Sequence, residues 1–282
     1  MKKNYLLRLL LSALACWALL ASGAAQAAMT CNLTSNGFTT SYSPANTTAT
    51  IVSASFTMTC TRSASGDALS QTYTVAANTG LNPAGGGLQA ASGSNRISYD
   101  LDTGSGCNAN RWKGGTKLGG TITFTSTSDF TPRTSTVSYW GCIGSGQNVA
   151  AGTYTDTVTM TPSIGTTATF PVTIVTSASC SISSPPGTMT FNYTSLQSGA
   201  ASASTSFSNT CSNSLPYTMA LDATSGTLIG LNYTLSLSAS SATGTGAAQS
   251  HTINGSVAAG QTGICSLSSC SATAARTLTI TY

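Results

Sequence analysis

The stretch TATFPVTIVT, residues 167–176, decides how the chain is divided into folded units. Its residues alternate in polarity as those of a β-strand do, with Ala168, Phe170, Val172 and Ile174 on one face. It lies between two similar halves of the chain, and nothing like it precedes the first half. The strand therefore either completes the first half or opens the second, and the two alternatives have different consequences for function.

The N-terminus has the parts of a secretory signal peptide. Three basic residues precede an apolar run over residues 9–21, and Ala25-Gln26-Ala27 follows as a small-x-small cleavage motif. A membrane anchor is the weaker alternative, because the apolar run is shorter than the roughly 20 residues of a spanning helix. We predict a signal peptide over residues 1–27 and an exported mature chain that begins at Ala28.

The composition of the mature chain excludes several classes of function. Without the signal, seven basic residues stand against six Asp and no Glu, so the net charge falls from +4 to about +1. No basic stripe remains to bind nucleic acid or an anionic membrane surface. Ser, Thr, Gly and Ala dominate, which disfavours long helices and is typical of short strands joined by Gly turns. We predict an all-β protein.

The cysteines divide into two sets of four once Cys16 leaves with the signal. An even number of cysteines in an exported protein indicates disulfides. The first two cysteines of each half are separated by nearly the same number of residues, which suggests two copies of one arrangement. We therefore pair the cysteines within each half: Cys31 with Cys60, Cys107 with Cys142, Cys180 with Cys211, and Cys265 with Cys270.

The two halves also correspond, loosely, in their strand-like segments. The matched pairs are QTYTVAA (71–77) with LPYTMAL (215–221), RISYDLD (96–102) with GLNYTLSL (230–237), SYWGCIGSGQ (138–147) with TINGSVAAGQ (252–261), and TYTDTVTM (153–160) with ARTLTITY (275–282). In the last pair we align Val158 with Leu278 and Met160 with Ile280. Short strands at this spacing predict two β-sandwich domains, residues 28–176 and 177–282.

The order of these motifs resembles the spore coat protein U domain family, which includes subunits of archaic chaperone-usher pili. The resemblance covers residues 31–282 and is most specific in GSGQNVAAGTYTDTVTM, residues 144–160. The second half departs from the pattern where ICSLSSCSATAART, residues 264–277, replaces the GxYxDT segment. The resemblance implies immunoglobulin-like sandwiches that lack a last strand, which a periplasmic chaperone and then a neighbouring pilin subunit supply at the outer-membrane usher.

The residues themselves support a missing strand in the second half. Its last strand-like segment, residues 276–282, ends with the chain, so we expect an unpaired edge and a strip of exposed core. We expect Leu278, Ile280 and Tyr282 to line the groove that takes a strand from a partner. In the first half the equivalent segment is followed by a short turn and by residues 167–176, which we predict to be a donor strand in cis. The alternative, that residues 166–180 open the second domain, stays open.

The start of the predicted mature chain bears on its place in a fibre. Three residues precede Cys31, and about 10 Å of chain is too short to fill a groove. Such a subunit accepts a strand but donates none, which predicts the tip of a pilus on the cell surface, attachment to an abiotic or host surface, and biofilm formation. The alternative is a secreted spore-coat or cell-envelope structural protein that is not assembled into pili.

A long insertion distinguishes the first half. Residues 103–134 stand where the second half has only residues 238–249. We predict that the insertion lies at the pole away from the second domain and presents four side chains for adhesion: Trp112, Lys113, Lys117 and Phe130. The alternative is that Trp112 packs in the core of its own domain.

Catalytic, metal and cofactor sites are not indicated. Hydrolase triads and acid–base pairs need His or paired carboxylates, and the one histidine, His251, has no suitable neighbour in the sequence. Asp100 and Asp102 share a strand face but are too few oxygen ligands for Ca²⁺, and no CxxC pair accompanies a His. We predict a protein that is not an enzyme and has no cofactor.

Overall fold

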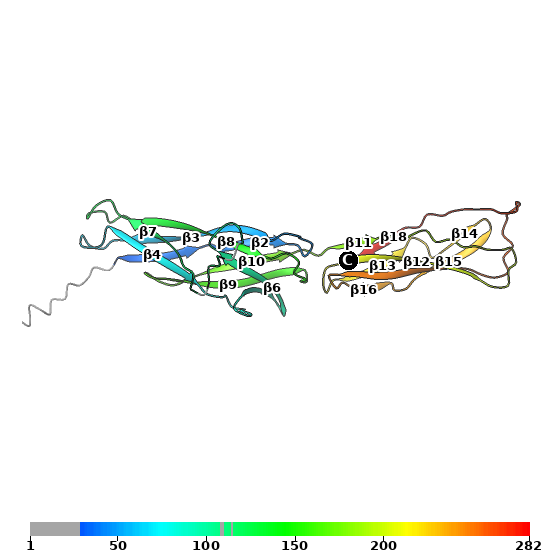
Figure 1. Ribbon diagram of the computed structural model, residues 1–282, viewed down its shortest axis with the longest axis horizontal. Helices are drawn as coiled ribbons and strands as arrows, with labels where there is room; N and C mark the ends of the chain where they lie inside the picture. Colours follow the sequence, from blue (N-terminus) through cyan, green and yellow to red (C-terminus); the bar gives the residue numbers. More distant parts are fainter. Residues whose placement is uncertain (1–28, 108–109, 114) are drawn as a thin grey trace, which may run out of the picture.

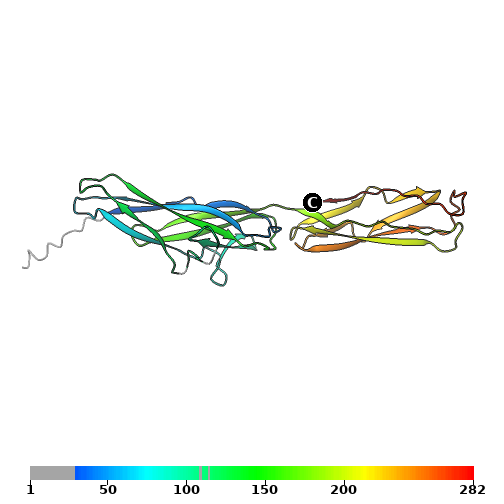
Figure 2. The ribbon, with the colours of Figure 1, turned by 45° about the horizontal axis from the view of Figure 1, so that its top comes forward.

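The computed structural model describes residues 29–107, 110–113 and 115–282, so the predicted signal peptide lies outside the described residues. Every regular element in the described residues is a β-strand. The strands form two sandwiches placed end to end, and the chain passes once between them (Figure 1 and Figure 2). We call them the N-terminal sandwich, with strands β1–β10, and the C-terminal sandwich, with strands β11–β18. The prediction of an all-β protein with two immunoglobulin-like sandwiches is confirmed.

The N-terminal sandwich has two layers. One contains β1 (Thr30–Ser35), β3 (Thr50–Thr61), β8 (Arg133–Ile143) and the end of β6 (Asn95–Asp102). The other contains β2 (Phe38–Tyr42), β10 (Ala168–Thr176), β9 (Gly152–Pro162), β4 (Ser70–Ala77), β7 (Leu118–Thr123) and β5 (Leu88–Ser92). Strand β6 joins the two layers, because its first half pairs with β5 and its last residues pair with β8.

The quoted stretch forms β10, which lies between β9 and β2. It pairs antiparallel with β9 from Ala168 to Thr176 and parallel with β2 from Val172 onward. The side chains of Phe170, Val172 and Ile174 are fully buried in the core. Pro171, on the opposite face in the sequence pattern, stands before the parallel ladder begins, so its missing N–H removes no bond from that ladder. The segment is thus a central strand of the N-terminal sandwich.

Trp112 packs in the core of the N-terminal sandwich, so its predicted exposure is wrong. Its side chain is 0% exposed, and its ring centroid lies 5.3 Å from that of Phe56, 4.9 Å from that of Tyr139 and 6.3 Å from that of Phe170. The indole Nε1 donates a hydrogen bond to the carbonyl of Val75 at 2.9 Å. The insertion folds back along the sandwich and places its largest apolar side chain between the layers, where removing its surface from water stabilises the fold most.

The remainder of the insertion has two parts. Only one of them lies at the pole of the sandwich, where the whole insertion was predicted to lie. Around Trp112 it lies along β6 and β8, where Cys107 is bonded to Cys142 and Lys113 Nζ forms an ion pair with Asp100 at 2.9 Å. Residues 124–132 follow β7, at the pole away from the C-terminal sandwich (Figure 1). Phe130 is 46% exposed there. Lys113 is therefore paired with Asp100 and mostly covered, so its predicted place on an exposed adhesive loop is also wrong.

The C-terminal sandwich repeats the arrangement with fewer strands. Its five-stranded layer has the order β11 (Cys180–Ser184), β12 (Ala201–Cys211), β17 (Ala248–Val257), β15 (Leu231–Leu237), β14 (Ser225–Leu228). Its three-stranded layer has the order β16 (Ser241–Thr243), β13 (Pro216–Leu221), β18 (Leu278–Thr281). Its buried apolar cluster is much smaller than that of the N-terminal sandwich. The two units share a plan but differ in how much core they close.

Disulfides lie within each unit. Cys31–Cys60 and Cys180–Cys211 join the first strand of each sandwich to its neighbour, Cys107–Cys142 ties the insertion to β8, and Cys265–Cys270 closes a short exposed loop before β18. The described disulfides therefore cross-link each sandwich internally. Across the junction, Asn148 Nδ2 donates to the Thr245 carbonyl at 2.8 Å, and Ala150 forms an isolated β-bridge with Asn213.

Replacing Trp112 with Ala should destabilise the N-terminal sandwich by about 3–5 kcal/mol, because the change leaves a large cavity beside Phe56 and Tyr139. Urea unfolding of the mature chain, followed by tyrosine fluorescence, measures the effect. Lys117→Ala, at an exposed position of the same insertion, is the matched control and should change stability little. Equal stability of the two variants would contradict the buried position of Trp112.

Candidate functional site: the unpaired edge of the C-terminal sandwich

Backbone hydrogen bonds fix which residues of the two sandwiches correspond. The backbone N–H of Thr159 donates to Asn78 Oδ1 at 2.8 Å, and that of Thr277 donates to Asp222 Oδ1 at 3.1 Å. In the reverse direction, Asn78 N donates to the Thr159 carbonyl and Asp222 N to the Thr277 carbonyl. Thr277 therefore occupies the place of Thr159, one residue before β18 begins.

This match shifts the alignment of the last strands by two residues. Leu278 lies opposite Leu221 as Met160 lies opposite Ala77, so Leu278 corresponds to Met160. The sequence alignment, which matched Leu278 to Val158, is wrong. Alternating strands look alike after a shift of two residues, because the side-chain period is two.

The C-terminal sandwich has no counterpart of β10. Residues 177–282 are all described, and among them β18 pairs with β13 and with no other strand. In the N-terminal sandwich the equivalent strand, β9, is paired with β10 from Gly152 to Met160. Residues 185–194, which follow β11 as β2 follows β1, form no regular strand. Both neighbours of the absent strand therefore lack its ladder of hydrogen bonds.

Residues 185–194 nevertheless lie where β2 lies in the N-terminal sandwich. Two contacts occur in both sandwiches. In the first, an aromatic ring packs against a glycine of a strand: Phe38 on Gly141, and Phe191 on Gly255. In the second, a tyrosine hydroxyl accepts a hydrogen bond from a backbone N–H: Tyr42 from Gln147, and Tyr193 from Gln261. The segment is thus held in place by its side chains, while its backbone stays outside any ladder. We call the space between this segment and β18 the acceptor groove.

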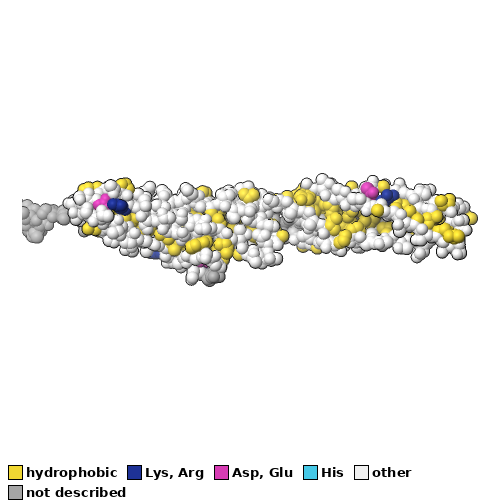
Figure 3. Space-filling model, turned by 90° about the horizontal axis from the view of Figure 1, so that it is seen from above, with side chains coloured by type: hydrophobic (Ala, Val, Ile, Leu, Met, Phe, Trp, Pro, Cys, Tyr) yellow, Lys and Arg dark blue, Asp and Glu magenta, His cyan; other side chains and the backbone are white. Residues whose placement is uncertain are grey.

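Apolar side chains are left partly uncovered along the acceptor groove. Leu278 and Ile280 are half-buried, whereas Met160, at the place of Leu278, is fully buried. Tyr282 is 59% exposed just beyond β18. Figure 3 shows hydrophobic side chains in a strip along the C-terminal sandwich, with one basic and one acidic side chain beside it. An unpaired strand edge next to exposed core is a template for strand addition.

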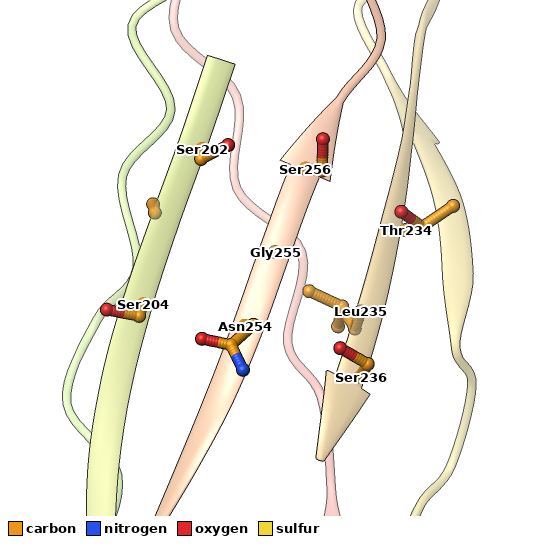
Figure 4. Close-up of a pocket in the computed structure, with 9 residues that line it drawn as sticks. Ser202, Ser204, Thr234, Leu235, Ser236, Asn254, Gly255 and Ser256 are labelled. Carbon is orange, nitrogen blue, oxygen red and sulfur yellow. The ribbon is translucent and has the colours of Figure 1, made fainter. Parts of the chain in front are cut away.

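A second surface of the C-terminal sandwich is shallow and polar. Hydroxyl and amide side chains line it on the five-stranded layer (Figure 4): Ser202, Ser204, Thr234, Ser236, Asn254 and Ser256. The strand register matches this surface to one in the N-terminal sandwich. Ser256 pairs with Thr234, and Cys142 pairs with Asp100 at the corresponding positions. In the N-terminal sandwich this face is the one that the insertion covers, with its disulfide and its ion pair. The bare face has no charged or nucleophile-activating group.

The pole of the N-terminal sandwich away from the junction is built around a buried arginine. Arg62 is 2% exposed and donates to the backbone carbonyls of Ser126 and Asp67, each at 2.7 Å. Its guanidinium lies 5.7 Å from the ring centroid of Phe124 and 5.8 Å from that of Phe130. Because Arg62 binds both loops at this pole, the one with Asp67 and the one with Ser126, the half-exposed ring of Phe130 is held on a fixed support.

Asp129 fixes the loop that carries Phe130. Its carboxylate accepts hydrogen bonds from Thr131 Oγ1 at 2.6 Å, from Thr125 N at 3.0 Å and from Arg133 Nη2 at 2.8 Å. These bonds, that of Thr131 first, hold the pKa of Asp129 well below its usual value. The loop therefore stays ordered by a charged group at neutral pH.

His251 takes part in packing in the C-terminal sandwich. Its ring is 9% exposed, its Nε2 lies 3.0 Å from the hydroxyl of Tyr217, and its ring centroid is 5.3 Å from that of Phe207. The described residues hold no group of three or more His, Cys, Asp or Glu side chains placed to bind a metal ion. Helices long and apolar enough to span a membrane are also absent from the part of the chain that is described.

These features define an all-β, disulfide-bonded protein in which one sandwich is complete and its copy presents an unpaired edge. A family model described as the Spore Coat Protein U domain matches residues 17–161 and 166–236. The matches cover well over half of the chain, so the chain belongs to the Spore Coat Protein U domain family. Each match begins the same distance ahead of the first cysteine of its half, which places β10 at the start of the second match.

None of the curated proteins compared with the chain matches it in sequence. Three solved structures are similar to it. The CsuC–CsuE chaperone–tip adhesion subunit pre-assembly complex from archaic chaperone-usher Csu pili of Acinetobacter baumannii is 11% identical, with a TM-score of 0.37 over 89% of this chain and 99% of that one. The CupB6 tip adhesin from Pseudomonas aeruginosa is 12% identical, with a TM-score of 0.36 over 84% and 89%.

The third similar structure is a chaperone–tip adhesin complex of CFA/I fimbriae biogenesis. It is 10% identical, with a TM-score of 0.31 over 87% of this chain and 94% of that one. At these identities and scores we draw nothing about function from the three similarities.

The N-terminal sandwich should fold only when β10 is present, because Phe170, Val172 and Ile174 fill its core and each contributes about 1.5–3 kcal/mol on burial. The test compares chains of residues 28–176 and 28–161, expressed in the periplasm, by soluble yield and thermal melting. A chain of residues 28–176 with Val175→Thr, changed on the exposed face of β10, is the control. Equal yield and melting of the long and short chains would refute the role of β10.

Proposed function

We propose that the protein is a subunit of a chaperone-usher pilus whose C-terminal sandwich accepts a strand from another protein. One observation carries the proposal: β10 completes the N-terminal sandwich, and the C-terminal sandwich has the same plan without that strand. Unpaired backbone groups beside uncovered core destabilise an isolated domain, and a strand added in trans removes both defects. On this proposal the domains are residues 28–176 and 177–282.

The partners follow from where such a strand is needed. A periplasmic chaperone fills the acceptor groove after export, and a neighbouring pilin subunit replaces it when an outer-membrane usher assembles the fibre. Leu278 and Ile280 line the groove on the β18 side, and Met189 and Phe191 line it on the other. Each partner would complete the ladder on β18 and cover these side chains. Tyr282, predicted to line the groove too, follows β18 and lies beside residues 216–218 and 241–243.

The place of the subunit in the fibre follows from the use of β10. In the second family match, the segment ahead of Cys180 begins with the residues of β10. That segment is already buried within the N-terminal sandwich and is not free to enter another subunit. We therefore assign the protein to the pilus tip, with its N-terminal sandwich outward and an abiotic or host surface as its ligand.

Attachment is assigned to the outer pole of the N-terminal sandwich. Phe130 is 46% exposed and Leu69 is 39% exposed on the two loops that lead into and out of the Arg62 cluster. Exposed apolar side chains on a fixed support suit insertion into a surface without ordering cost. Lys117 is exposed just before β7 but lies at the end of that strand away from this pole, so it is not part of the assigned surface. Biofilm formation would be the cellular consequence.

A structural role without catalysis agrees with the described chemistry. The one histidine is packed against aromatic rings, and the polar surface of Figure 4 has only neutral side chains. A coat or envelope protein that never joins a fibre is the alternative function. It differs from the pilus proposal in having no need of an exogenous strand.

Recovery of the C-terminal sandwich should depend on a partner. Produced in the periplasm without a chaperone, the full chain should be degraded or aggregate. With the cognate chaperone it should be recovered as a one-to-one complex, because the chaperone strand pairs with β18. Gel filtration and limited proteolysis distinguish the two states. A stable monomer made without a chaperone, with a protected C-terminal sandwich, would support the coat-protein alternative.

Immunogold labelling tests the place in the fibre. Antibody to the N-terminal sandwich should label one end of each pilus, because β10 is not available to a second subunit. Antibody to a shaft subunit labels the whole fibre and serves as the control. Gold along the full length would reject the assignment to the tip.

Phe130→Ala should reduce surface attachment of piliated cells severalfold and leave pilus number unchanged, because the side chain lies at the outer pole and contributes little to the core. Leu81→Ala is the matched control, since Leu81 is 71% exposed beside Asp156, away from that pole. Added salt should have little effect on apolar attachment. Equal attachment by both variants would remove Phe130 from the adhesive surface.

A further inference from the structure

The acceptor groove carries a cation where the N-terminal sandwich has an apolar core residue. Since Thr277 occupies the place of Thr159, Arg276 occupies the place of Val158. Val158 is fully buried and lies directly opposite Phe170 of β10. Arg276 therefore faces the position at which an incoming strand would present the equivalent of Phe170.

A second replacement makes room for the arginine. Leu88 lies opposite Tyr99 in the N-terminal sandwich, and Gly226 lies opposite Tyr233 in the C-terminal one. A Cβ atom at Gly226 would clash with Arg276 Nη2. A buried valine and leucine are thus exchanged for an arginine and a glycine, and the guanidinium takes the space of the leucine side chain.

The guanidinium is held by groups of β14 and β15. Its Nη2 donates to the hydroxyl of Tyr233 and to the carbonyl of Ser225, the latter at 3.3 Å, and it lies 5.5 Å from the ring centroid of Tyr233. The Asp222 carboxylate is 4.0 Å from Nη1. Asp222 Oδ1 already accepts the backbone N–H groups of Thr277 and Ala223.

The corresponding hydroxyls of Tyr99 and Tyr233 contact groups of opposite charge in the two sandwiches. In the N-terminal sandwich the Tyr99 hydroxyl donates to Asp156 Oδ2 at 2.7 Å, and burial with this bond raises the pKa of Tyr99 well above its usual value. Asp156 lies opposite Val172 of β10. The closed sandwich thus has an acid at this tyrosine hydroxyl, and the open one has a cation at the corresponding hydroxyl of Tyr233.

Filling the groove would take water away from Arg276. Its side chain is now 30% exposed, whereas Val158 under β10 is fully buried. A cation that loses its water without a closely bound anion is strongly destabilising. Asp222 and Arg276 are the only Asp, Glu, Lys or Arg residues in positions 177–282, so the C-terminal sandwich has no second anion to supply.

We propose that the strand that fills the acceptor groove carries a carboxylate side chain opposite Arg276, at the position that Phe170 holds in β10. The inference rests on the proposed function, because it names the chemistry of the accepted strand. Residues directly opposite in an antiparallel pair have neighbouring side chains, and a carboxylate binds guanidinium through two charge-assisted hydrogen bonds. The groove then selects this partner over strands of the β10 type, which have an aromatic ring there.

Three synthetic peptides test the proposal on the full mature chain released from its chaperone. One copies residues 166–177, TTATFPVTIVTS, and the others carry Phe170→Glu and Phe170→Gln. Glu and Gln have the same shape, so their difference reports the charge. The Glu peptide should bind about tenfold more tightly than the Gln peptide by fluorescence anisotropy, and the ratio should shrink as salt is added.

Two variants of the chain locate the effect. Arg276→Gln should bind the Glu and Gln peptides equally, and Arg276→Glu should prefer a fourth peptide, which carries Phe170→Lys. Where a variant is recovered poorly, the comparison of peptides and the salt dependence on the unaltered chain still decide. Equal binding of the Glu and Gln peptides to that chain, or a Glu preference that persists in Arg276→Gln, would overturn the inference and leave the acceptor groove standing. Binding of none of the peptides would count against the groove itself.

Discussion

The hydrogen-bond ladder on each side of β10 is the interaction on which the N-terminal sandwich depends. One strand pairs with β9 along its whole length and with β2 at its end, and it buries three large apolar side chains between them. Where this strand is absent, in the C-terminal sandwich, the segment equivalent to β2 is irregular and β18 is much shorter than β9. A strand buried on both edges is thus required by its neighbours for their own regular structure.

Comparing the two sandwiches separates the features that need the extra strand from those that do not. The disulfide of the first strand pair, the ring against a strand glycine and the Tyr–Gln contact occur in both, so these features form without the extra strand. The features that differ lie where that strand touches: Val158 against Arg276 and Leu88 against Gly226. The shared features define the fold, and the differences lie at the edge that β10 closes in one sandwich and that stays unpaired in the other.

Some of this structure could be predicted from the sequence and some could not. Alternation over residues 168–176 is strong enough to mark both a strand and its buried face, and paired cysteine spacing indicates a duplicated unit. Trp112 was misplaced because a Gly-rich insertion between strands has the composition of a surface loop, and only the tertiary fold turns one of its side chains inward. The register of β18 was missed because the loop closed by Cys265 and Cys270 removes the GxYxDT motif that would have aligned it.

Residues beside the groove were missed for a related reason. The parallel pairing of β2 with β10 joins segments far apart in the sequence, and no local pattern encodes it. FTTSY in the first half and FNY in the second do share an aromatic residue followed closely by tyrosine, and this is the signal by which the second segment could have been found. The charged pair at the groove left a signal too, because Asp222 and Arg276 are isolated in an otherwise uncharged half.

The insertion helps to hold β10 in place on β9, and the C-terminal sandwich has no such insertion beside β18. Trp112 lies against both Phe56 of β3 and Phe170 of β10, so it links the donor strand to the opposite layer of the N-terminal sandwich. The Cys107–Cys142 disulfide and the ion pairs of Asp100 hold the insertion that carries it. The corresponding connection of the C-terminal sandwich, residues 238–249, is short and has no aromatic residue. The donor strand of the N-terminal sandwich is thus held in place by a tryptophan, and the absence of such a contact in the C-terminal sandwich agrees with the proposal that its strand comes from a partner.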